Sequence, residues 1–314
     1  MGLKVVDLFS GAGGFSAGFR DAGFEVVAGL DIDLDSVRSF SINFPRAVAI
    51  REDARLIRGS DIVKYVGDVD VVIGGPPCEA YTGANPRRMS EPLDRLYSDE
   101  LGQLTLEFIR LVGELKPRVF VMENVAAIME GGLREALISE FRRVGYRDVY
   151  FNVLHAEDYS VPSVRRRVFI SNIVIKPPKV GRLTTVAEAL KGLPEPTPLI
   201  PNHEPVTVSG RKIKGISRVN WGQALFTYRG SGGTYRNFIR LHPNKPAPTV
   251  MGSIRFIHPF EDRLLTVREQ ARLMGFPDTH VFMGSRDSQF NQVGEAVPPP
   301  LAKAIAEVVK GKLT

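Results

Sequence analysis

The chain has 314 residues, of which 43% are hydrophobic and 24% charged, as expected of an ordinary globular protein. No apolar run approaches the roughly 18 residues of a membrane span, and the N-terminus lacks the pattern of a secretion signal, so we expect a cytoplasmic protein without a membrane partner. The single cysteine excludes an internal disulfide and argues against a cysteine-ligated zinc site, and we predict no bound metal.

The positive charge is concentrated in one part of the chain. The net charge is +6, and residues 165–260 contain 16 Lys and Arg against three acidic residues. The rest of the chain has 25 basic and 32 acidic residues, so this segment holds all of the positive excess. Such a distribution indicates a surface that faces phosphates, although a solvated basic face without a ligand would look the same.

The first half of the chain alternates short apolar, β-rich runs with amphipathic helical patterns. Strands are expected at residues 3–9, 25–30, 47–50, 70–75 and 118–123. Because strands that alternate with helices form parallel sheets, we predict a doubly wound α/β domain. Two further runs, at residues 148–154 and 167–175, are expected to extend the sheet with an antiparallel member.

A glycine-rich turn follows the first expected strand, in the run DLFSGAGGF (7–15). Gly11 and Gly13 permit a tight turn and close approach of a ligand to the backbone. Asp31 ends the second expected strand, where a carboxylate can accept hydrogen bonds from ribose hydroxyls. Asp53, after the third expected strand, could take an adenine amino group. The pattern predicts an adenosine-containing cofactor without saying which one.

The one thiol of the chain, Cys78, follows the fourth expected strand in the run GGPPCE (74–79). A buried structural cysteine is the plain alternative, but two prolines fix the backbone just before this one. Glu123 and Asn124 close the fifth expected strand at the same edge of the sheet. A thiol and a carboxyl group on neighbouring strand ends form a nucleophile and acid pair, and Asn124 is placed to brace the Pro-Cys turn.

Two arginines, Arg165 and Arg167, lead into the seventh expected strand. By the two-residue period of a strand they share one face, so their guanidinium groups are expected to point together. Such a pair suits a carbonyl oxygen or a phosphate, whereas the alternative is a solvated strand edge.

The composition changes after Ile175, where a Pro-rich and Gly-rich segment begins. Helical patterns return at residues 266–276 and 300–312, and we expect them to pack back onto the first part of the chain. We therefore predict a catalytic domain of residues 1–176 and 263–314, and a smaller, basic, irregular domain of residues 177–262.

Taken together, these segments resemble the motif series of S-adenosylmethionine-dependent DNA (cytosine-5)-methyltransferases, in the family's order and over nearly the whole chain. DLFSGAGGF resembles the cofactor motif, GGPPCEAYT the Pro-Cys nucleophile motif, MENV the Glu-Asn-Val motif and VPSVRRRVF the Gln-x-Arg-x-Arg motif. RLLTVREQARLMGFP and QVGEAVPPPLAKAI resemble the two closing motifs. The resemblance implies a Rossmann-like methyltransferase fold, with residues 177–262 as the target-recognition domain.

The resemblance also implies roles for single residues. Cys78 would attack carbon 6 of a cytosine turned out of duplex DNA, and Glu123 would hold N3 of that base. Arg165 and Arg167 would contact the cytosine O2 and the backbone of the active site. The S-adenosylmethionine site would be formed by Phe9, Gly11, Gly13, Asp31, Asp53, Pro77 and Leu104. No residue stands out as the base that removes the proton from carbon 5.

The sequence departs from the family pattern at several positions. Glu79 replaces the usual Gln after the nucleophile, Ser163 stands where Gln is expected, and Glu295 replaces Asn in the last motif. None of these changes removes a bond-making group.

Duplex DNA is the expected substrate, the protein is expected to be a monomer, and a cognate restriction endonuclease is a possible functional partner. The candidates for phosphate or base contacts are Arg211, Lys212, Lys214, Arg218, Arg229, Arg236 and Arg240.

One alternative is methylation of transfer RNA, but the Cys-Phe-Thr signature of that branch is reduced here to Leu225-Phe226-Thr227. A catalytically silent DNA-binding regulator is the alternative from another class, against which the intact Pro-Cys and Glu-Asn-Val motifs argue. A nicotinamide or flavin oxidoreductase on this sheet would leave Cys78 and the basic segment unused.

Overall fold

The computed structural model of the protein describes residues 2–207 and 214–314. Its centre is a seven-stranded sheet with the strand order β3-β2-β1-β4-β5-β7-β6. The first five strands pair in parallel, and β7 runs antiparallel to both of its neighbours. The strands are β1 (Lys4–Leu8), β2 (Glu25–Asp31), β3 (Val48–Arg51), β4 (Val71–Gly74), β5 (Val119–Asn124), β6 (Tyr150–His155) and β7 (Arg166–Ser171). The predicted mostly parallel α/β fold with an antiparallel member is therefore confirmed.

β7, the last strand of the sheet in chain order, is shorter than its apolar run suggests. β7 ends at Ser171, because the next side chain, the amide of Asn172, takes over the pairing with the neighbouring strand. Its Oδ1 accepts from the backbone amide of Phe120 at 3.1 Å, and its Nδ2 donates to the carbonyl of Arg118 at 2.9 Å. The side chain of Asn172 thus replaces the backbone in pairing with the neighbouring segment, at a position where the sequence predicted that the strand would continue.

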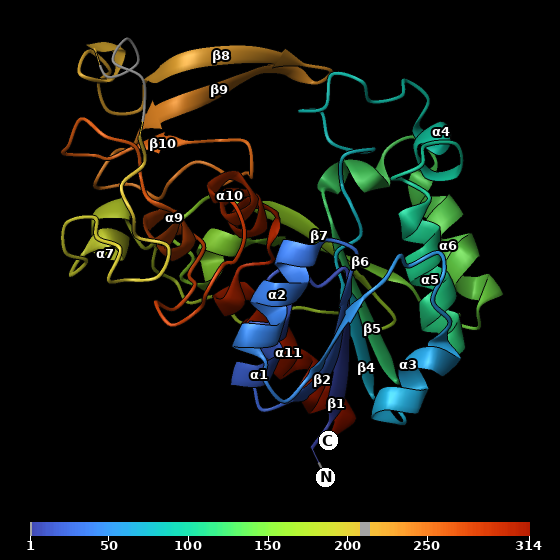
Figure 1. The fold of residues 1–314 in the computed structure, drawn as a ribbon. Helices are drawn as coiled ribbons and strands as arrows, with labels where there is room; N and C mark the ends of the chain where they lie inside the picture. Colours follow the sequence, from blue (N-terminus) through green and yellow to red (C-terminus); the bar gives the residue numbers. More distant parts are fainter. Residues whose placement is uncertain (1, 208–213) are drawn as a thin grey trace.

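Helices cover both faces of the sheet, as Figure 1 shows. On one face Phe19 packs with Ile305, and on the other Phe108 packs with Phe120. The helices around the sheet are α1 (Gly14–Asp21), α2 (Leu34–Asn43), α3 (Gly59–Val66), α4 (Pro92–Tyr97), α5 (Leu104–Leu115), α6 (Leu133–Arg143) and α11 (Pro299–Leu313), with short 3-10 turns η1 (Ala126–Met129) and η2 (Ala156–Tyr159). Among residues 2–207 and 214–314, no helix is long and apolar enough to cross a membrane.

The C-terminal helix returns to the first part of the chain, as predicted. α11 begins with Pro299 and Pro300, which is favourable at the first helical positions because the first amides have no partner within the helix. It lies so close to α1 that a Cβ on Gly18 would come within 2.3 Å of the Cβ of Ala302. Glycine at this position is therefore required by the packing of the two helices.

A second, three-stranded sheet has the order β10-β9-β8. It consists of β8 (Ala224–Gly230) and β9 (Gly233–Arg240), which form a long hairpin, and the short β10 (Phe256–Ile257). In Figure 1 this hairpin extends from one lobe of the molecule, above the strand ends of the large sheet, toward the loop that follows β4. The hairpin belongs to the segment in which the sequence predicts a separate, basic part of the protein.

The segment of the hairpin shares its hydrophobic core with the helices that follow it. Val186, Ile239 and Phe256 pack in one cluster with Phe282 and Phe290. The helices of this part are α7 (Val186–Leu190), α9 (Val267–Leu273) and α10 (Arg286–Glu295). The segment of the hairpin is therefore fixed by its hydrophobic side chains to α9, α10 and the residues between them.

Candidate active site

The predicted site residues meet at one edge of the large sheet, where β1, β2, β4 and β5 end. These strands are parallel, so their carboxyl ends lie side by side and present the loops that follow them. The glycine-rich turn follows β1, Asp31 ends β2, Cys78 follows β4, and Glu123 is the second-last residue of β5.

The glycine-rich turn has an unusual backbone. Phe9 has a φ of 59°, a left-handed conformation that a bulky residue rarely adopts. Gly11 has a φ of 52° and open space on the side where a Cβ would lie. Gly13 has a φ of 87°, and a Cβ there would come within 2.3 Å of Phe44. The turn is therefore held in a strained conformation, and it leaves the backbone of Gly11 accessible to a ligand.

The predicted carboxylates take up different positions beside this turn. Asp31 accepts hydrogen bonds from the backbone amides of Gly11 at 2.8 Å and Asp33 at 2.9 Å, and it is thus tied to the turn. Burial raises the pKa of Asp31, against the effect of these amides. Asp53 follows the neighbouring strand and accepts from the amide of Arg55 at 2.9 Å. The hydroxyl of Ser10, which no sequence pattern singled out, is buried and has no hydrogen-bond partner among residues 2–207 and 214–314.

The thiol of the chemical end lies in the loop after β4, and the carboxyl group lies in β5, the neighbouring strand, as expected. β4 pairs with β5 in parallel, and a Cβ on Gly75 would lie 3.3 Å from Oε2 of Glu123. Asn124 donates from Nδ2 to the carbonyl of Pro76 at 3.2 Å, which is the predicted brace on the Pro-Cys turn. Cys78 is partly exposed, whereas Glu123 is buried with 7% of its surface exposed.

Both arginines, Arg165 and Arg167, lie at this site, but one binds a carboxylate and the other binds backbone carbonyls. Nε of Arg167 is 2.9 Å from Oε1 of Glu123, an ion pair between two nearly buried side chains. Arg165 is buried and donates from Nη1 to the carbonyls of Val250 at 2.8 Å and Gly294 at 2.9 Å. Arg165 thus joins the large sheet to two segments far along the chain, which the two-residue strand period could not reveal.

The surroundings of Cys78 favour the neutral thiol over the thiolate. Loss of hydration around the sulfur is the main cause that raises its pKa to about 12, with the negative charges of Glu79 and Glu123 adding to it. The positive charges of Arg167 and Arg165 act in the opposite direction. A nucleophilic role therefore requires that a bound substrate change the surroundings of the thiol.

Alkylation of Cys78 should report this pKa directly, since the chain has no other thiol. Thiolate is the reactive form, so the rate of reaction with iodoacetamide should rise about tenfold per pH unit across pH 7 to 9. In urea the rate for the same protein should be half-maximal near pH 8.5, about the pKa of a free thiol, and should level off roughly one pH unit above it. A plateau below pH 9 in the folded protein would contradict the assigned surroundings.

Glu295 joins the site without having been predicted there. It is the last residue of α10, next to the carbonyl of Gly294 that binds Arg165. Partial loss of hydration and the negative charges of Glu79 and Asp31 raise its pKa to about 7, and Arg165 opposes the shift. The one sequence signal was the departure from the family's asparagine.

The sequence matches the family of C-5 cytosine-specific DNA methylases over residues 3–179 and 198–311. The chain belongs to this family. M.MjaORF1200P of Methanocaldococcus jannaschii is 45% identical over 364 residues, covering 99% of both chains. The type II methyltransferase M1.HphI of Haemophilus parahaemolyticus is 37% identical over 330 residues, covering 98% of this chain and 87% of that protein. A solved structure from Escherichia coli, described as a prophage DNA modification methyltransferase, has a TM-score of 0.80 at 28% identity and covers 99% of both chains.

The predicted family and the predicted enzyme class, a DNA (cytosine-5)-methyltransferase, are therefore confirmed. Within the described ranges 2–207 and 214–314 of this methylase, no three His, Cys, Asp or Glu side chains gather in a group that could hold a metal ion.

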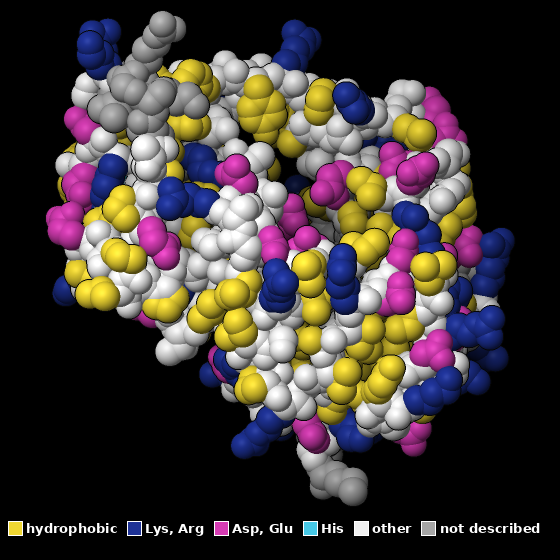
Figure 2. All heavy atoms as spheres, viewed as in Figure 1, with side chains coloured by type: hydrophobic (Ala, Val, Ile, Leu, Met, Phe, Trp, Pro, Cys, Tyr) yellow, Lys and Arg dark blue, Asp and Glu magenta, His cyan; other side chains and the backbone are white. Residues whose placement is uncertain are grey.

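The tip of the β8–β9 hairpin touches the loop of residues 79–91 that follows the cysteine of this methylase. The amide of Gly232 donates to the carbonyl of Gly83 at 2.8 Å. Gly83, Gly230 and Gly232 have no left-handed φ, yet a Cβ on any of them would meet atoms of the opposite segment at 3.1 Å or less. Close contact therefore explains these glycines. Figure 2 shows a hollow below the hairpin with acidic side chains on its rim.

Replacing Gly230 with alanine should separate the hairpin from this loop. The new Cβ would lie 2.5 Å from the carbonyl oxygen of Gly83 and 2.9 Å from that of Ala84, both of them backbone atoms. Hydrogen exchange of the Gly232 amide should become faster, because it loses its acceptor. The matched control is Gly311→Ala, where no atom lies within 4 Å of the new Cβ. Unchanged exchange in Gly230→Ala would show that the contact contributes nothing.

The basic side chains of the hairpin segment fall into two groups. Arg229 and Arg236 are exposed, as are Lys214 and Arg218. Arg240, by contrast, is buried and donates to the carbonyls of Val219 at 2.6 Å and His258 at 3.1 Å, and it forms an ion pair with Asp262. Arg240 therefore stabilises the fold and is not free for DNA, contrary to its place among the predicted contacts. Arg211 and Lys212 lie outside the described residues.

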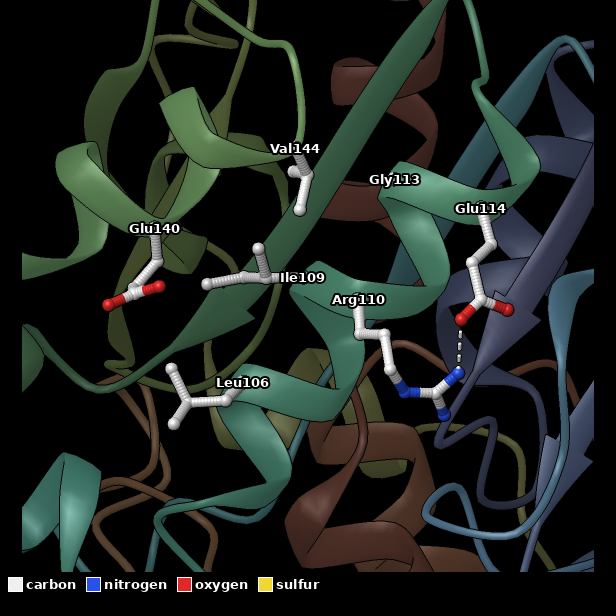
Figure 3. A pocket seen from close by; sticks show the side chains of 7 residues that line it. All are labelled: Leu106, Ile109, Arg110, Gly113, Glu114, Glu140 and Val144. Carbon is white, nitrogen blue, oxygen red and sulfur yellow. Dashed lines mark hydrogen bonds and ion pairs between the residues drawn. The ribbon is translucent and has the colours of Figure 1, made fainter.

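A shallow pocket lies away from this edge, between α5 and α6 (Figure 3). Leu106, Ile109 and Val144 line it together with charged side chains, among which Arg110 donates to Glu114 at 2.7 Å. None of the predicted site residues lines this pocket, and its other carboxylate, Glu140, is paired with Arg143. The chemistry of the methylase is therefore to be sought at the strand ends.

Proposed function

We propose that this methylase transfers a methyl group from S-adenosylmethionine to carbon 5 of a cytosine turned out of a specific duplex DNA sequence, through a covalent bond between Cys78 and carbon 6. The observation that carries the proposal is that Cys78 follows β4 and Glu123 lies at the end of the neighbouring strand β5, with Asn124 bound to Pro76. A silent DNA-binding protein would have no need of this arrangement.

The residues around the glycine-rich turn fit S-adenosylmethionine. Gly11 leaves open space beside the backbone, and the buried hydroxyl of Ser10 lacks a partner. Asp31 at the end of β2 is suited to ribose hydroxyls and Asp53 to the adenine amino group. The full proposed set is Phe9, Gly11, Gly13, Asp31, Asp53, Pro77 and Leu104. When bound, the sulfonium supplies the methyl group.

The residues of the chemical end would activate the cytosine. Carbon 5 of cytosine is too weak a nucleophile by itself, so the thiolate of Cys78 adds at carbon 6 and moves electrons toward carbon 5. Glu123 contacts N3 and favours the charge that develops there. Arg167 holds Glu123 in place at 2.9 Å, and Arg165 fixes the surrounding backbone. The two arginines would also bind the cytosine O2.

Residues 177–262 would act as the target-recognition domain. Carbon 6 is inaccessible within a duplex, so the base must leave the stack at a cost of about a few kcal/mol, which protein contacts to DNA must offset. Exposed basic residues such as Arg229 and Arg236 are suited to phosphates or to guanine edges in the major groove. Residues 1–176 and 263–314 would form the catalytic domain.

A restriction–modification role is supported by the type II methyltransferases among the relatives. In that role the methylase would protect cellular DNA against a cognate restriction endonuclease. We further propose that the protein acts as a monomer in the cytoplasm, on the DNA of the nucleoid.

Bisulfite sequencing of a plasmid treated with the protein and S-adenosylmethionine tests this function. We expect fully converted background cytosines and one protected cytosine within a single recurring sequence. A parallel assay measures methyl incorporation into total transfer RNA, the alternative substrate. Incorporation into transfer RNA without any protected plasmid cytosine would replace the DNA proposal, and no incorporation into either would favour a silent DNA-binding protein.

A further inference from the structure

The proposed reaction leaves one proton to be removed, from carbon 5 once the methyl group is there, and the inference that follows rests on that proposed function. Glu123 is assigned to N3 and is paired with Arg167. Asp31 already accepts hydrogen bonds from two backbone amides. Cys78 is bonded to carbon 6 at this stage. None of these groups is free to accept the proton.

Glu295 lies between the two ends of the site. On one side of it, the carbonyl of Gly294 accepts a hydrogen bond from Arg165 at 2.9 Å. On the other side, a Cβ on Gly14 at the start of α1 would lie 3.0 Å from the Cβ of Ala296. The backbone of Glu295 is thus fixed between the arginine of the chemical end and the turn of the cofactor end. In the proposed reaction, the cytosine that accepts the methyl group and the S-adenosylmethionine that donates it would have to meet between these same two ends of the site.

The carboxylate of Glu295 is near enough to Glu79, Asp31 and Arg165 for their charges to act on it. Its side chain is exposed, and in the part of the chain that the structure describes no group donates a hydrogen bond to it. The charges that act on it are Glu79, Asp31 and Asp33, which disfavour ionisation, and Arg165, which favours it. Loss of hydration and these repulsions bring its pKa to about 7, near the value that suits a proton acceptor at neutral pH.

We propose that Glu295 is the base that removes the carbon 5 proton. A carboxylate oxygen of Glu295 takes the proton, the C5–H electron pair becomes the C5=C6 double bond, and the C6–S bond breaks with both electrons going to the Cys78 sulfur. The products are 5-methylcytosine in DNA, the Cys78 thiolate and a protonated Glu295, which then gives its proton to water. The asparagine of the family motif cannot accept this proton, so the step distinguishes this chain from the family pattern.

The variant Glu295→Gln tests this role, because it keeps the size of the side chain and removes the basic oxygen. Duplex DNA with tritium at carbon 5 of the target cytosine reports proton removal, and labelled methyl groups report transfer. We expect the first methyl transfer to proceed while tritium release slows about 10²- to 10³-fold. The enzyme should accumulate as a covalent adduct, stable in detergent, on ordinary cytosine.

Glu140→Gln is the matched control, because it removes a carboxylate on α6, away from the strand ends, and leaves Glu295 in place. It should release tritium without accumulating an adduct. Glu79→Gln tests the surroundings of Glu295. Since the charge of Glu79 raises the pKa of Glu295, the acid limb of the elimination rate should move to lower pH in Glu79→Gln.

Equal rates of tritium release and methyl transfer in Glu295→Gln, with no adduct, would overturn the proposal. Adduct accumulation in Glu79→Gln instead would also overturn it, by moving the base to the residue beside the nucleophile. Failure of the proposed function looks different, because the unaltered protein would then transfer no methyl group and release no tritium.

Discussion

Replacing Cys78 with alanine should abolish methyl transfer to duplex DNA, by about four orders of magnitude or more. In the proposed mechanism carbon 5 would gain its nucleophilic character only through a bond between this sulfur and carbon 6, and no other thiol is present to replace it. The measurement is single-turnover transfer of labelled methyl groups to a duplex that carries the recognised sequence.

The control for this variant is binding of the same duplex. The exposed basic residues of the hairpin segment are untouched, so affinity and its steep dependence on salt should stay as they are in the unaltered protein. Turnover that survives the loss of Cys78 would remove this residue from the mechanism, whereas loss of DNA binding would point to a damaged fold.

Replacing Glu123 with glutamine should lower turnover about 10²- to 10³-fold, the usual effect of removing one group that stabilises developing charge. The variant keeps the shape of the side chain but loses the carboxyl group that we propose for N3 and that pairs with Arg167 at 2.9 Å. The quantity to measure is the rate of methyl transfer at saturating DNA and cofactor.

Glu140→Gln is a matched control for this change, because Glu140 lies on α6 and pairs with Arg143 at 2.8 Å, away from the strand ends. It should turn over at the normal rate. An unchanged rate in Glu123→Gln would mean that the carboxyl group serves only to hold Arg167.

Much of the fold follows from local patterns in the sequence. The apolar stripe of α5 (Leu104, Phe108, Leu111 and Leu115) is buried as its spacing predicts. The position of Cys78 beside Glu123 follows from the rule that parallel strands end at one edge, and so does the contact from Asn124 to Pro76.

The contacts that could not be predicted join residues far apart in the chain. Arg165 binds carbonyls 85 and 129 positions away, and nothing in its own strand encodes those partners. The sequence does not indicate why position 230 is glycine, because the carbonyl of Gly83 that excludes a side chain there is on another segment. Charge counting placed Arg240 on a DNA surface, because composition cannot distinguish a guanidinium exposed to solvent from one that satisfies buried carbonyls.

The most direct test of the covalent mechanism uses a duplex with 5-fluorocytosine at the target position. Fluorine cannot leave carbon 5 as a proton does, so the reaction should stop at the adduct when S-adenosylmethionine is supplied. We predict a complex of one protein with one duplex that survives denaturation, with the DNA attached to the peptide that contains Cys78. No trapped complex, or attachment through any other residue, would contradict the account.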